Sequence, residues 1–405
     1  MSDALSDEDG HLELSEDAIS EADFTRAFDL NPADVFDIDT WDADAANLAG
    51  LSDRLNYEIE QAQRLHIDTR DAIRNVIFAR LKESPYAPSS VGLFRATTSE
   101  IESVARGALF NGSVEAVDGT NTVIDMLPLT VVQIGVVSTS YNGQRSEYGH
   151  RMFRRDLRNR GRDILDDTLQ LLEARRNRTG YDRSSKRDQY NDLMRRGLMA
   201  YAERAVLARK CSADWRMGQG NPLAYELLMG SGMPALIGPG VEVMRELILD
   251  HKRFVFVPSS KADRWHETLG TALDPLEYLV IETMEPYLER VLGGHYTGKW
   301  REPYEKYLLS FMEDVKQEVV VGVYRVSAIG PPHVFYAHRE HAHMAARIAM
   351  ADSALHEHRA FPMLLDLAHT LCSTMFSSDA LIAQTHVAFA DAGAALDYAT
   401  ERMTR

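Results

Sequence analysis

The stretch Val114-Glu-Ala-Val-Asp-Gly-Thr-Asn121 decides how the rest of the chain is interpreted. Its valines and alanine are typical of a short buried strand, and residues 118–121 predict a sharp exit from that strand. A sheet fixes an aspartate at a strand end, and a following glycine permits close approach of backbone or substrate, so that the carboxylate of Asp118 is suited to hold a metal ion. Asp-Gly is also the commonest hairpin signal, and a simple turn is the alternative interpretation.

Length and composition indicate an intracellular globular protein. The 405 residues are 45% hydrophobic and include two cysteines, Cys211 and Cys372. This length suits one large domain or two ordinary ones, and so few cysteines argue against a disulfide framework and fit a reducing compartment. The sequence shows neither a signal peptide nor an apolar run as long as a membrane span, which predicts a cytoplasmic protein without a membrane association.

The net charge of −17 is concentrated in the first segment. Residues 1–60 contain 18 Asp and Glu but two basic residues, and subtraction from the totals of 61 and 44 leaves 43 acidic against 42 basic residues in the remainder. We expect residues 1–50 to be an acidic, flexible tail that is either disordered or docked on a basic surface through its aromatic residues. The near-neutral body, residues 51–405, is not excluded from binding nucleic acid, because a ligand feels the local field.

The charge reverses between Arg145 and Lys210, which contain 18 Lys and Arg against 10 Asp and Glu. Apolar periodicity predicts a helix near 156–176 and a second helix from about Gln189 to Arg209. The basic residues form either a solvated helical face or a surface that contacts phosphates. The candidate nucleic-acid-binding residues are Arg151, Arg154, Arg155 and Arg158.

Strand and helix signals alternate through the body, which predicts an α/β fold. A strand over Ala224–Met229, a helix over about Val241–His251 and a strand over Arg253–Val257 would form a βαβ unit with parallel strands. Ligands in such sheets lie beyond the carboxyl ends of the strands, where Asp118, Gly230 and Lys261 are expected. Further strands are predicted at 129–137, 319–326 and 333–336, with helices at 51–82, at 265–316 and from His341 to the end.

Two groups of residues are candidates for chemistry. Hydrolysis of a phosphodiester with two metal ions needs several carboxylates around the ions. Asp118 and Glu203 are the candidates, because Glu203 has mostly apolar neighbours on its helix and would need a partner or a metal there; an exposed helical charge is the alternative. The densest histidine group, around His338 and His341, contains no HExxH motif, and we interpret it as surface histidines and not as a zinc site.

The order of these segments resembles that of the NurA-type nucleases, which act with HerA-type hexameric ATPases. The resemblance extends from about Val114 to Ala392 and depends on four places. These are Ala116-Val-Asp-Gly-Thr120, the helix that carries Glu203, the segment from Ala224 to Lys261, and Arg359-Ala-Phe-Pro-Met-Leu-Leu-Asp-Leu-Ala-His369.

The resemblance implies a ribonuclease-H-like mixed sheet flanked by helices, with a core at about 110–262 and C-terminal strands and helices at about 317–395. It also implies a homodimer that cleaves DNA with Mn²⁺ or Mg²⁺. By position, Asp118 and Glu203 would hold the metal, His369 would lie near the scissile phosphate and Lys261 would contact it. The implied function is DNA-end processing or anti-phage defence with a HerA-type ATPase.

Two positions depart from the family pattern. Met229 stands where the family has an aspartate, and its thioether is a poor ligand for a hard cation. Phe361 stands where the family has a tyrosine. Glu226, which lies nearby, would point to the other face of the predicted strand and would be a poor substitute. The alternative function is therefore a weakened or inactive NurA-like subunit that clamps DNA and regulates its partner ATPase.

Overall fold

The computed structural model describes residues 20–41, 48–125, 129–155, 164–166, 168–169, 172, 192–259, 264–293 and 298–394. It divides into two units, residues 1–69 and 70–405, and the boundary falls within one long helix. Among the described residues, no helix combines the length and the apolar character that a membrane crossing requires.

The first unit contains helices within the segment expected to be an unstructured tail. They are α1 (Glu21–Phe28), α2 (Pro32–Val35), η1 (Ile38–Thr40) and the first part of α3 (Leu48–Ala72). The side chains of Ser20 and Asn31 accept hydrogen bonds from backbone N–H groups at the starts of α1 and α2, which explains why helices begin there. The rest of the expected tail, residues 1–19 and 42–47, lies outside the described residues.

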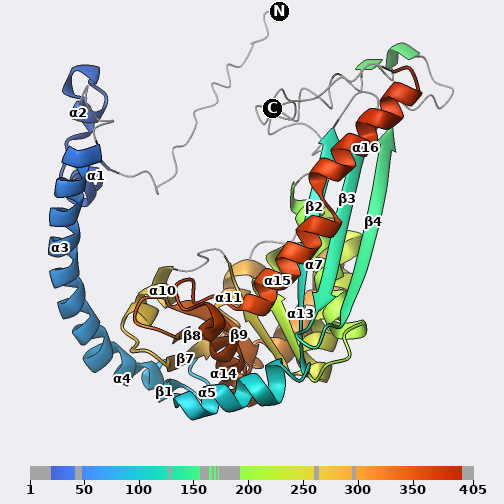
Figure 1. Ribbon diagram of the computed structural model, residues 1–405. Helices are drawn as coiled ribbons and strands as arrows, with labels where there is room; N and C mark the ends of the chain where they lie inside the picture. The colour runs from blue at the N-terminus through green and yellow to red at the C-terminus, as the bar shows by residue number, and fades with distance from the viewer. Residues whose placement is uncertain are drawn as a thin grey trace, which may run out of the picture. The chain divides into compact units, whose positions relative to one another are not determined.

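The second unit is built around one mixed sheet of nine strands (Figure 1). The strands are β1 (Gly92–Arg95), β2 (Val114–Asp125), β3 (Leu129–Thr139), β4 (Arg145–Arg155), β5 (Trp215–Gln219), β6 (Phe254–Val257), β7 (Glu277–Thr283), β8 (Val319–Arg325) and β9 (His333–His338). Their order is β1-β7-β8-β9-β6-β5-β2-β3-β4. Strands β2, β3 and β4 are antiparallel neighbours, whereas β5 and β6 run parallel to β2. This arrangement confirms the predicted α/β fold with a mixed sheet.

Helices cover both faces of the sheet. After the end of α3, the helices and turns of this unit are η2 (Ile73–Ile77), α4 (Phe78–Arg80), η3 (Leu81–Glu83), α5 (Thr98–Val104), η4 (Ala105–Leu109), α7 (Asp192–Arg209), α8 (Tyr225–Leu228), η5 (Gly230–Gly232), η6 (Pro234–Leu236), α9 (Ile237–Arg245), η7 (Glu246–His251), α10 (Arg264–Thr271), α11 (Glu285–Leu292), η8 (Gly298–Trp300), α12 (Arg301–Pro303), η9 (Tyr304–Leu308), α13 (Leu309–Val315), η10 (Arg339–His341), α14 (Ala342–Ser353), η11 (Ala354–His356), α15 (Met363–Met375) and α16 (Ser378–Asp391). One core packs α7, α9, α11 and α13 against the sheet, and a second core packs α5, α14 and α15 against the opposite face.

Two parts of the predicted topology are wrong. Residues 225–228 form helix α8 and no strand, so that the true parallel partner of β6 is β5. Residues 277–283, expected within a helical stretch, form β7 between β1 and β8. Both errors concern short apolar runs, in which periodicity does not separate a strand from a buried helix. The strands predicted at 129–137, 253–257, 319–326 and 333–336 are confirmed, as are the helices near 51–82, 189–209 and 241–251.

Candidate active site

Asp118 lies inside β2, because the strand continues to Asp125. The predicted exit at residue 118 is therefore wrong, and so is the alternative of a hairpin turn there: Asp118 and Gly119 pair with Val137 and Val136 of β3. The parallel pairing with β5 reaches only Val117 opposite Gly218. Asp118 is thus the first residue of β2 beyond the parallel part of the sheet, at the edge where ligands of such sheets bind.

His369 of α15 contacts Asp118 directly. Its Nδ1 atom lies 2.7 Å from Oδ2 of Asp118, and its side chain is 63% exposed whereas that of Asp118 is 3% exposed. Burial raises the pKa of Asp118, and the hydrogen bond and charge of His369 oppose this rise. The pair therefore joins a buried carboxylate to an imidazole that solvent reaches.

Glu203 of α7 approaches the same strand from its other face. Residues 118 and 119 point to opposite faces because side chains alternate along a strand. A Cβ atom at position 119 would lie 2.6 Å from Oε1 of Glu203, so the carboxylate occupies the space that a side chain would fill. The side chain of Asp118 and the carboxylate of Glu203 thus lie on the two faces of β2, at consecutive positions of the strand.

The environment of Glu203 favours a proton or a cation on its carboxylate. Burial, helped by the negative charges of Asp118 and Glu226, raises the pKa of Glu203 to about 7 against the lowering effect of Arg204. Arg204 lies 3.4 Å away, but its guanidinium also donates to the carbonyls of Ala200, Asn221 and Pro222. One buried, shared arginine leaves this carboxylate only partly compensated.

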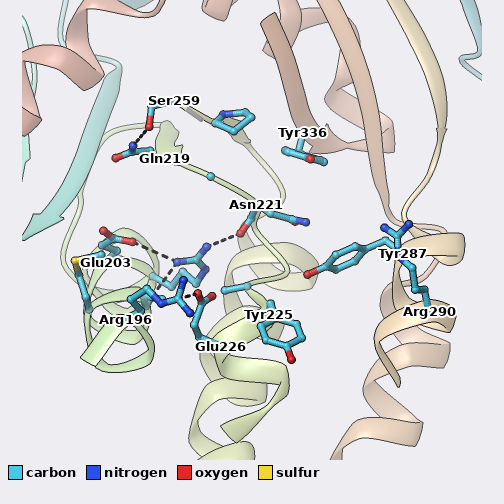
Figure 2. Close-up of a pocket in the computed structure, with 16 residues that line it drawn as sticks. Arg196, Glu203, Gln219, Asn221, Tyr225, Glu226, Ser259, Tyr287, Arg290 and Tyr336 are labelled. Carbon is cyan, nitrogen blue, oxygen red and sulfur yellow. Dashed lines mark hydrogen bonds and ion pairs between the residues drawn. The ribbon is translucent and has the colours of Figure 1, made fainter. Parts of the chain in front are cut away.

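A cavity of about 500 Å³ opens beside Glu203, at the carboxyl ends of β5 and β6 (Figure 2). Three tyrosines, two further arginines and a second carboxylate contribute to its lining: Tyr225, Tyr287, Tyr336, Arg196, Arg290 and Glu226. Asp118 and His369 are not part of the lining. The cavity has the size of typical ligand sites and combines aromatic with cationic side chains.

Comparison with known proteins finds similarity among solved structures. No protein-family profile and no curated protein matches the chain. The solved structures that the chain resembles include NurA nucleases. The NurA nuclease from Sulfolobus solfataricus is 10% identical, with a TM-score of 0.43, over 84% of this chain and 97% of that chain. A NurA structure with manganese is 10% identical, with a TM-score of 0.40, over 78% of this chain and 94% of that chain. A NurA structure bound to dAMP and manganese is 10% identical, with a TM-score of 0.35, over 80% of this chain and 93% of that chain.

At the two positions that depart from the NurA pattern, the side chains belong to the core. Met229 follows α8 and packs against the core that contains α7. Phe361 is 5% exposed and lies below the guanidinium of Arg359. Glu226 is on helix α8, so the expectation that a strand would turn it away from the site was wrong.

The candidate DNA-binding residues are placed in part. Arg151, Arg154 and Arg155 lie on β4, the edge strand of the sheet, and not on a helix. The Nε atom of Arg151 donates to Oε1 of Gln133 over 2.8 Å. Arg158, most of the predicted helix 156–176 and Lys261 lie outside the described residues.

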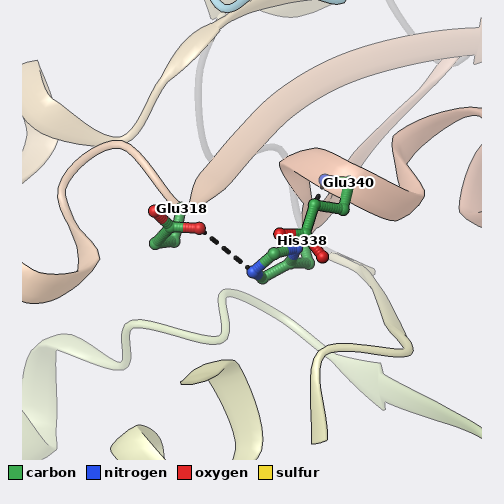
Figure 3. A group of neighbouring side chains, drawn as sticks. All are labelled: Glu318, His338 and Glu340. Atoms are coloured by element: carbon green, nitrogen blue, oxygen red, sulfur yellow. Dashed lines mark hydrogen bonds and ion pairs between the residues drawn. The ribbon is translucent and has the colours of Figure 1, made fainter. Parts of the chain in front are cut away.

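The histidine group brings Glu318, His338 and Glu340 together, with one ligand atom of each within 4.8 Å of the others (Figure 3). Arg339 and Lys252 form ion pairs with the two glutamates at 2.9 and 3.2 Å. The Nδ1 atom of His338 accepts the backbone N–H of Glu340, which leaves the proton of the neutral ring on Nε2. The two cations balance the two glutamates. His338 is completely buried, so the prediction that this group consists of surface histidines is wrong for this residue.

Proposed function

We propose that the protein is a metal-dependent deoxyribonuclease that hydrolyses phosphodiester bonds with Mn²⁺ or Mg²⁺. The observation that carries the proposal is the position of three residues around Asp118 and Gly119 of β2: His369 contacts Asp118 on one face of the strand, and Glu203 lies against Gly119 on the other. These are the three residues to which the resemblance to NurA-type nucleases assigns the chemistry.

The residues fit a divalent ion. Asp118 and Glu203 offer carboxylate oxygens, the donors that Mg²⁺ and Mn²⁺ prefer, and Gly119 leaves the space that the carboxylate of Glu203 occupies. Oδ2 is the atom of the Asp118 carboxylate that contacts His369. A bound divalent ion supplies Lewis-acid stabilisation of the phosphate and lowers the pKa of an attacking water.

His369 is suited to proton transfer. When its Nδ1–H donates to Asp118, the ring is fixed in the tautomer whose Nε2 accepts a proton. A fixed imidazole serves as a general base for water or, once protonated, as a general acid for the leaving oxygen. We include Lys261 as a further contact of the scissile phosphate.

DNA, a second copy of the chain and a HerA-type ATPase are the proposed partners. The arginines at 151, 154, 155 and 158 are proposed to contact DNA phosphates, which explains a basic segment in an acidic chain. A translocating ATPase would deliver DNA to the site in end processing or anti-phage defence, and the proposed location is the cytoplasm.

A second function is favoured by Met229 and Phe361. Met229 offers only a thioether, which is a poor ligand for a hard cation, and Phe361 has no hydroxyl. A chain with too few carboxylates would keep the fold as a DNA-clamping subunit that regulates the ATPase and does not cleave DNA.

Cleavage of linear DNA by the purified full chain with Mn²⁺ tests the proposal. We expect cleavage that Asp118→Ala abolishes, with unchanged thermal unfolding of the metal-free protein. Unchanged cleavage in Asp118→Ala would refute the site. No cleavage by the natural sequence, even with a HerA-type ATPase present, together with faster ATP hydrolysis, would favour the regulatory subunit.

A further inference from the structure

The residue that follows α15, Phe376, lies in a notch between two strands. Gly135 of β3 and Gly149 of β4 are direct partners in the hairpin, and a Cβ atom added at either position would meet the ring of Phe376. For Gly149 the distance to Cε1 of that ring would be 2.5 Å. One aromatic side chain therefore occupies the space that two side chains on adjacent strands would fill, which we call the Gly135–Gly149 notch.

Polar contacts hold the same end of α15. The side-chain amide of Gln133 donates from Nε2 to the carbonyl of Phe376 over 3.1 Å, and its Oε1 accepts Nε of Arg151 over 2.8 Å. Gln133 is 2% exposed, and burial of its amide without these partners would be costly. Carbonyl groups at the end of a helix have no partner within the helix, and Gln133 supplies one for the residue that caps α15.

The notch lies on the face of the sheet to which Asp118 points. Gly135 and Val137 share one face because side chains alternate along a strand, and Val137 is the direct partner of Asp118 on β2. His369 and Phe376 are seven residues apart, or about two helical turns, so both lie on the side of α15 that faces the sheet. The ring of Phe376 thus fixes α15 two turns away from the contact between His369 and Asp118.

We infer that Phe376 and Gln133 are positioning residues of the proposed site, which hold His369 against Asp118. The inference rests on the proposed function, because that function gives His369 its role in proton transfer. With 63% of its side chain exposed, His369 has little packing of its own, and its place depends on the helix that carries it. A misplacement of about 1 Å can cost about a hundredfold in rate, so the seat of this helix matters for the reaction.

Phe389 separates positioning from a general loss of packing. It is a second phenylalanine, 8% exposed, on the following helix α16, where it packs with Ile124 of β2 and Val131 of β3. Helices α15 and α16 follow one another along these strands (Figure 1). Alanine at position 376 or 389 therefore removes an aromatic ring from the same part of the sheet, but only position 376 belongs to the end of α15.

The ring tautomer of His369 tests the inference in the full, metal-free chain. Nitrogen-15 NMR of histidine-labelled protein distinguishes a neutral ring with Nδ1–H, as donation to Asp118 requires, from a mixture of the two tautomers. The signal is assigned by its loss in His369→Asn. We expect Phe376→Ala and the milder Phe376→Leu to convert the single tautomer into a mixture, with a smaller change in Gln133→Met. Phe389→Ala, the matched control, should keep the single tautomer.

Cleavage of DNA with Mn²⁺ provides the second measurement. We expect Phe376→Ala to lower kcat about tenfold or more, while KM for DNA and the Mn²⁺ affinity stay within about threefold, because the displaced group transfers protons and does not bind. Phe389→Ala should keep the natural kcat, although the lost ring lowers its unfolding temperature.

The outcomes distinguish the inference from the proposed function. A single Nδ1–H tautomer in both Phe376 variants would overturn the inference, and so would the same mixture in Phe389→Ala. Natural kcat in a Phe376 variant with mixed tautomers would also overturn it. Absence of DNA cleavage in the natural sequence, with the tautomers changing as expected, would instead refute the proposed function and leave the placement of His369 by Phe376 standing.

Discussion

The Nδ1 atom of His369 lies 2.7 Å from Oδ2 of Asp118, although 251 residues separate the two along the chain. The contact joins α15 on one face of the sheet to the middle of β2. On the opposite face of the same strand, Glu203 occupies the space above Gly119. The three residues of the proposed site thus come from a strand and from helices on both faces of the sheet.

Replacement of His369 separates proton transfer from metal binding. We expect His369→Asn to lower kcat for DNA cleavage by about 10²–10⁴, the usual contribution of a positioned acid or base. The Mn²⁺ affinity should change by less than about tenfold, because the asparagine amide nitrogen takes the position of Nδ1 and donates to Asp118. Single-turnover cleavage and calorimetry with Mn²⁺ measure the two quantities. A loss of Mn²⁺ binding equal to that in Asp118→Ala would assign His369 to the metal.

Gly119→Ala tests the space that Glu203 occupies. The new Cβ atom would lie 2.6 Å from Oε1 of Glu203 and 2.8 Å from Cγ of Met199, so that both side chains of α7 must move. We expect a cost of about 1–3 kcal/mol in the free energy of unfolding, from overpacking, together with weaker Mn²⁺ binding.

The control for this variant is Gly107→Ala, because a Cβ atom at position 107 would meet no atom within 4 Å. Urea unfolding and Mn²⁺ titration of both variants measure the effects. Equal behaviour of the two variants would contradict the close approach of Glu203 to β2.

The raised pKa of Glu203 predicts opposite pH dependences for metal binding and for metal-free stability. Metal displaces the proton, so Mn²⁺ affinity should rise up to about tenfold per pH unit below about pH 7 and then level off. Without metal, the folded state binds the proton more tightly than the unfolded state does. This contribution of Glu203 to stability is fully present below its ordinary pKa of 4.5 and is lost as the pH rises through about 7.

Calorimetry with Mn²⁺ between pH 5.5 and 8 measures the first dependence. Thermal unfolding of the metal-free natural sequence and of Glu203→Gln measures the second, and the natural sequence should lose stability relative to the variant as the pH rises from 4.5 to 7. A constant difference between their unfolding temperatures would contradict the burial of this carboxylate.

The arginines of β4 predict the salt dependence of DNA binding. If Arg154 and Arg155 neutralise phosphates, each replacement by alanine should reduce the slope of log affinity against log salt by about 0.9. Arg106→Ala is the control, because this side chain is 80% exposed on η4, at a distance in sequence from the basic segment. Fluorescence anisotropy with labelled DNA at several salt concentrations measures the slopes, and unchanged slopes in both β4 variants would remove this strand from the DNA interface.

Asp352 holds the start of the helix that carries His369. It is completely buried, and it accepts the hydroxyl of Tyr141 at 2.6 Å and the backbone N–H of Leu364 at 2.9 Å. Replacement by alanine leaves two buried donors without a partner, at about 1–3 kcal/mol each in the free energy of unfolding. We expect Asp352→Ala to lower the urea midpoint, whereas Asp250→Ala, on the exposed end of η7, should leave it nearly unchanged.

Local sequence patterns predicted the elements that have a marked hydrophobic periodicity or a long apolar run. The strand 319–325, with its run of valines, and the long helix 192–209 are in the predicted places, because their signals are strong enough to be independent of context. The short apolar run at 225–228 was misassigned because it fits a strand or a buried helix equally well. That error in turn hid Glu226, which is placed in the cavity only by α8.

The sequence by itself determined that three residues are unusual. Asp118 precedes a glycine in an apolar strand, Glu203 has apolar neighbours on its helix, and His369 ends a segment that resembles a motif of NurA-type nucleases. It did not determine that Asp118 lies within β2, that Glu203 covers Gly119 or that Glu226 lines the same cavity as Glu203. Those relationships depend on the register of β2 with β3 and β5 and on the packing of α7, α8 and α15. Only the tertiary structure decided them, because the contacts that fix a register and a helix position join residues that are distant in sequence.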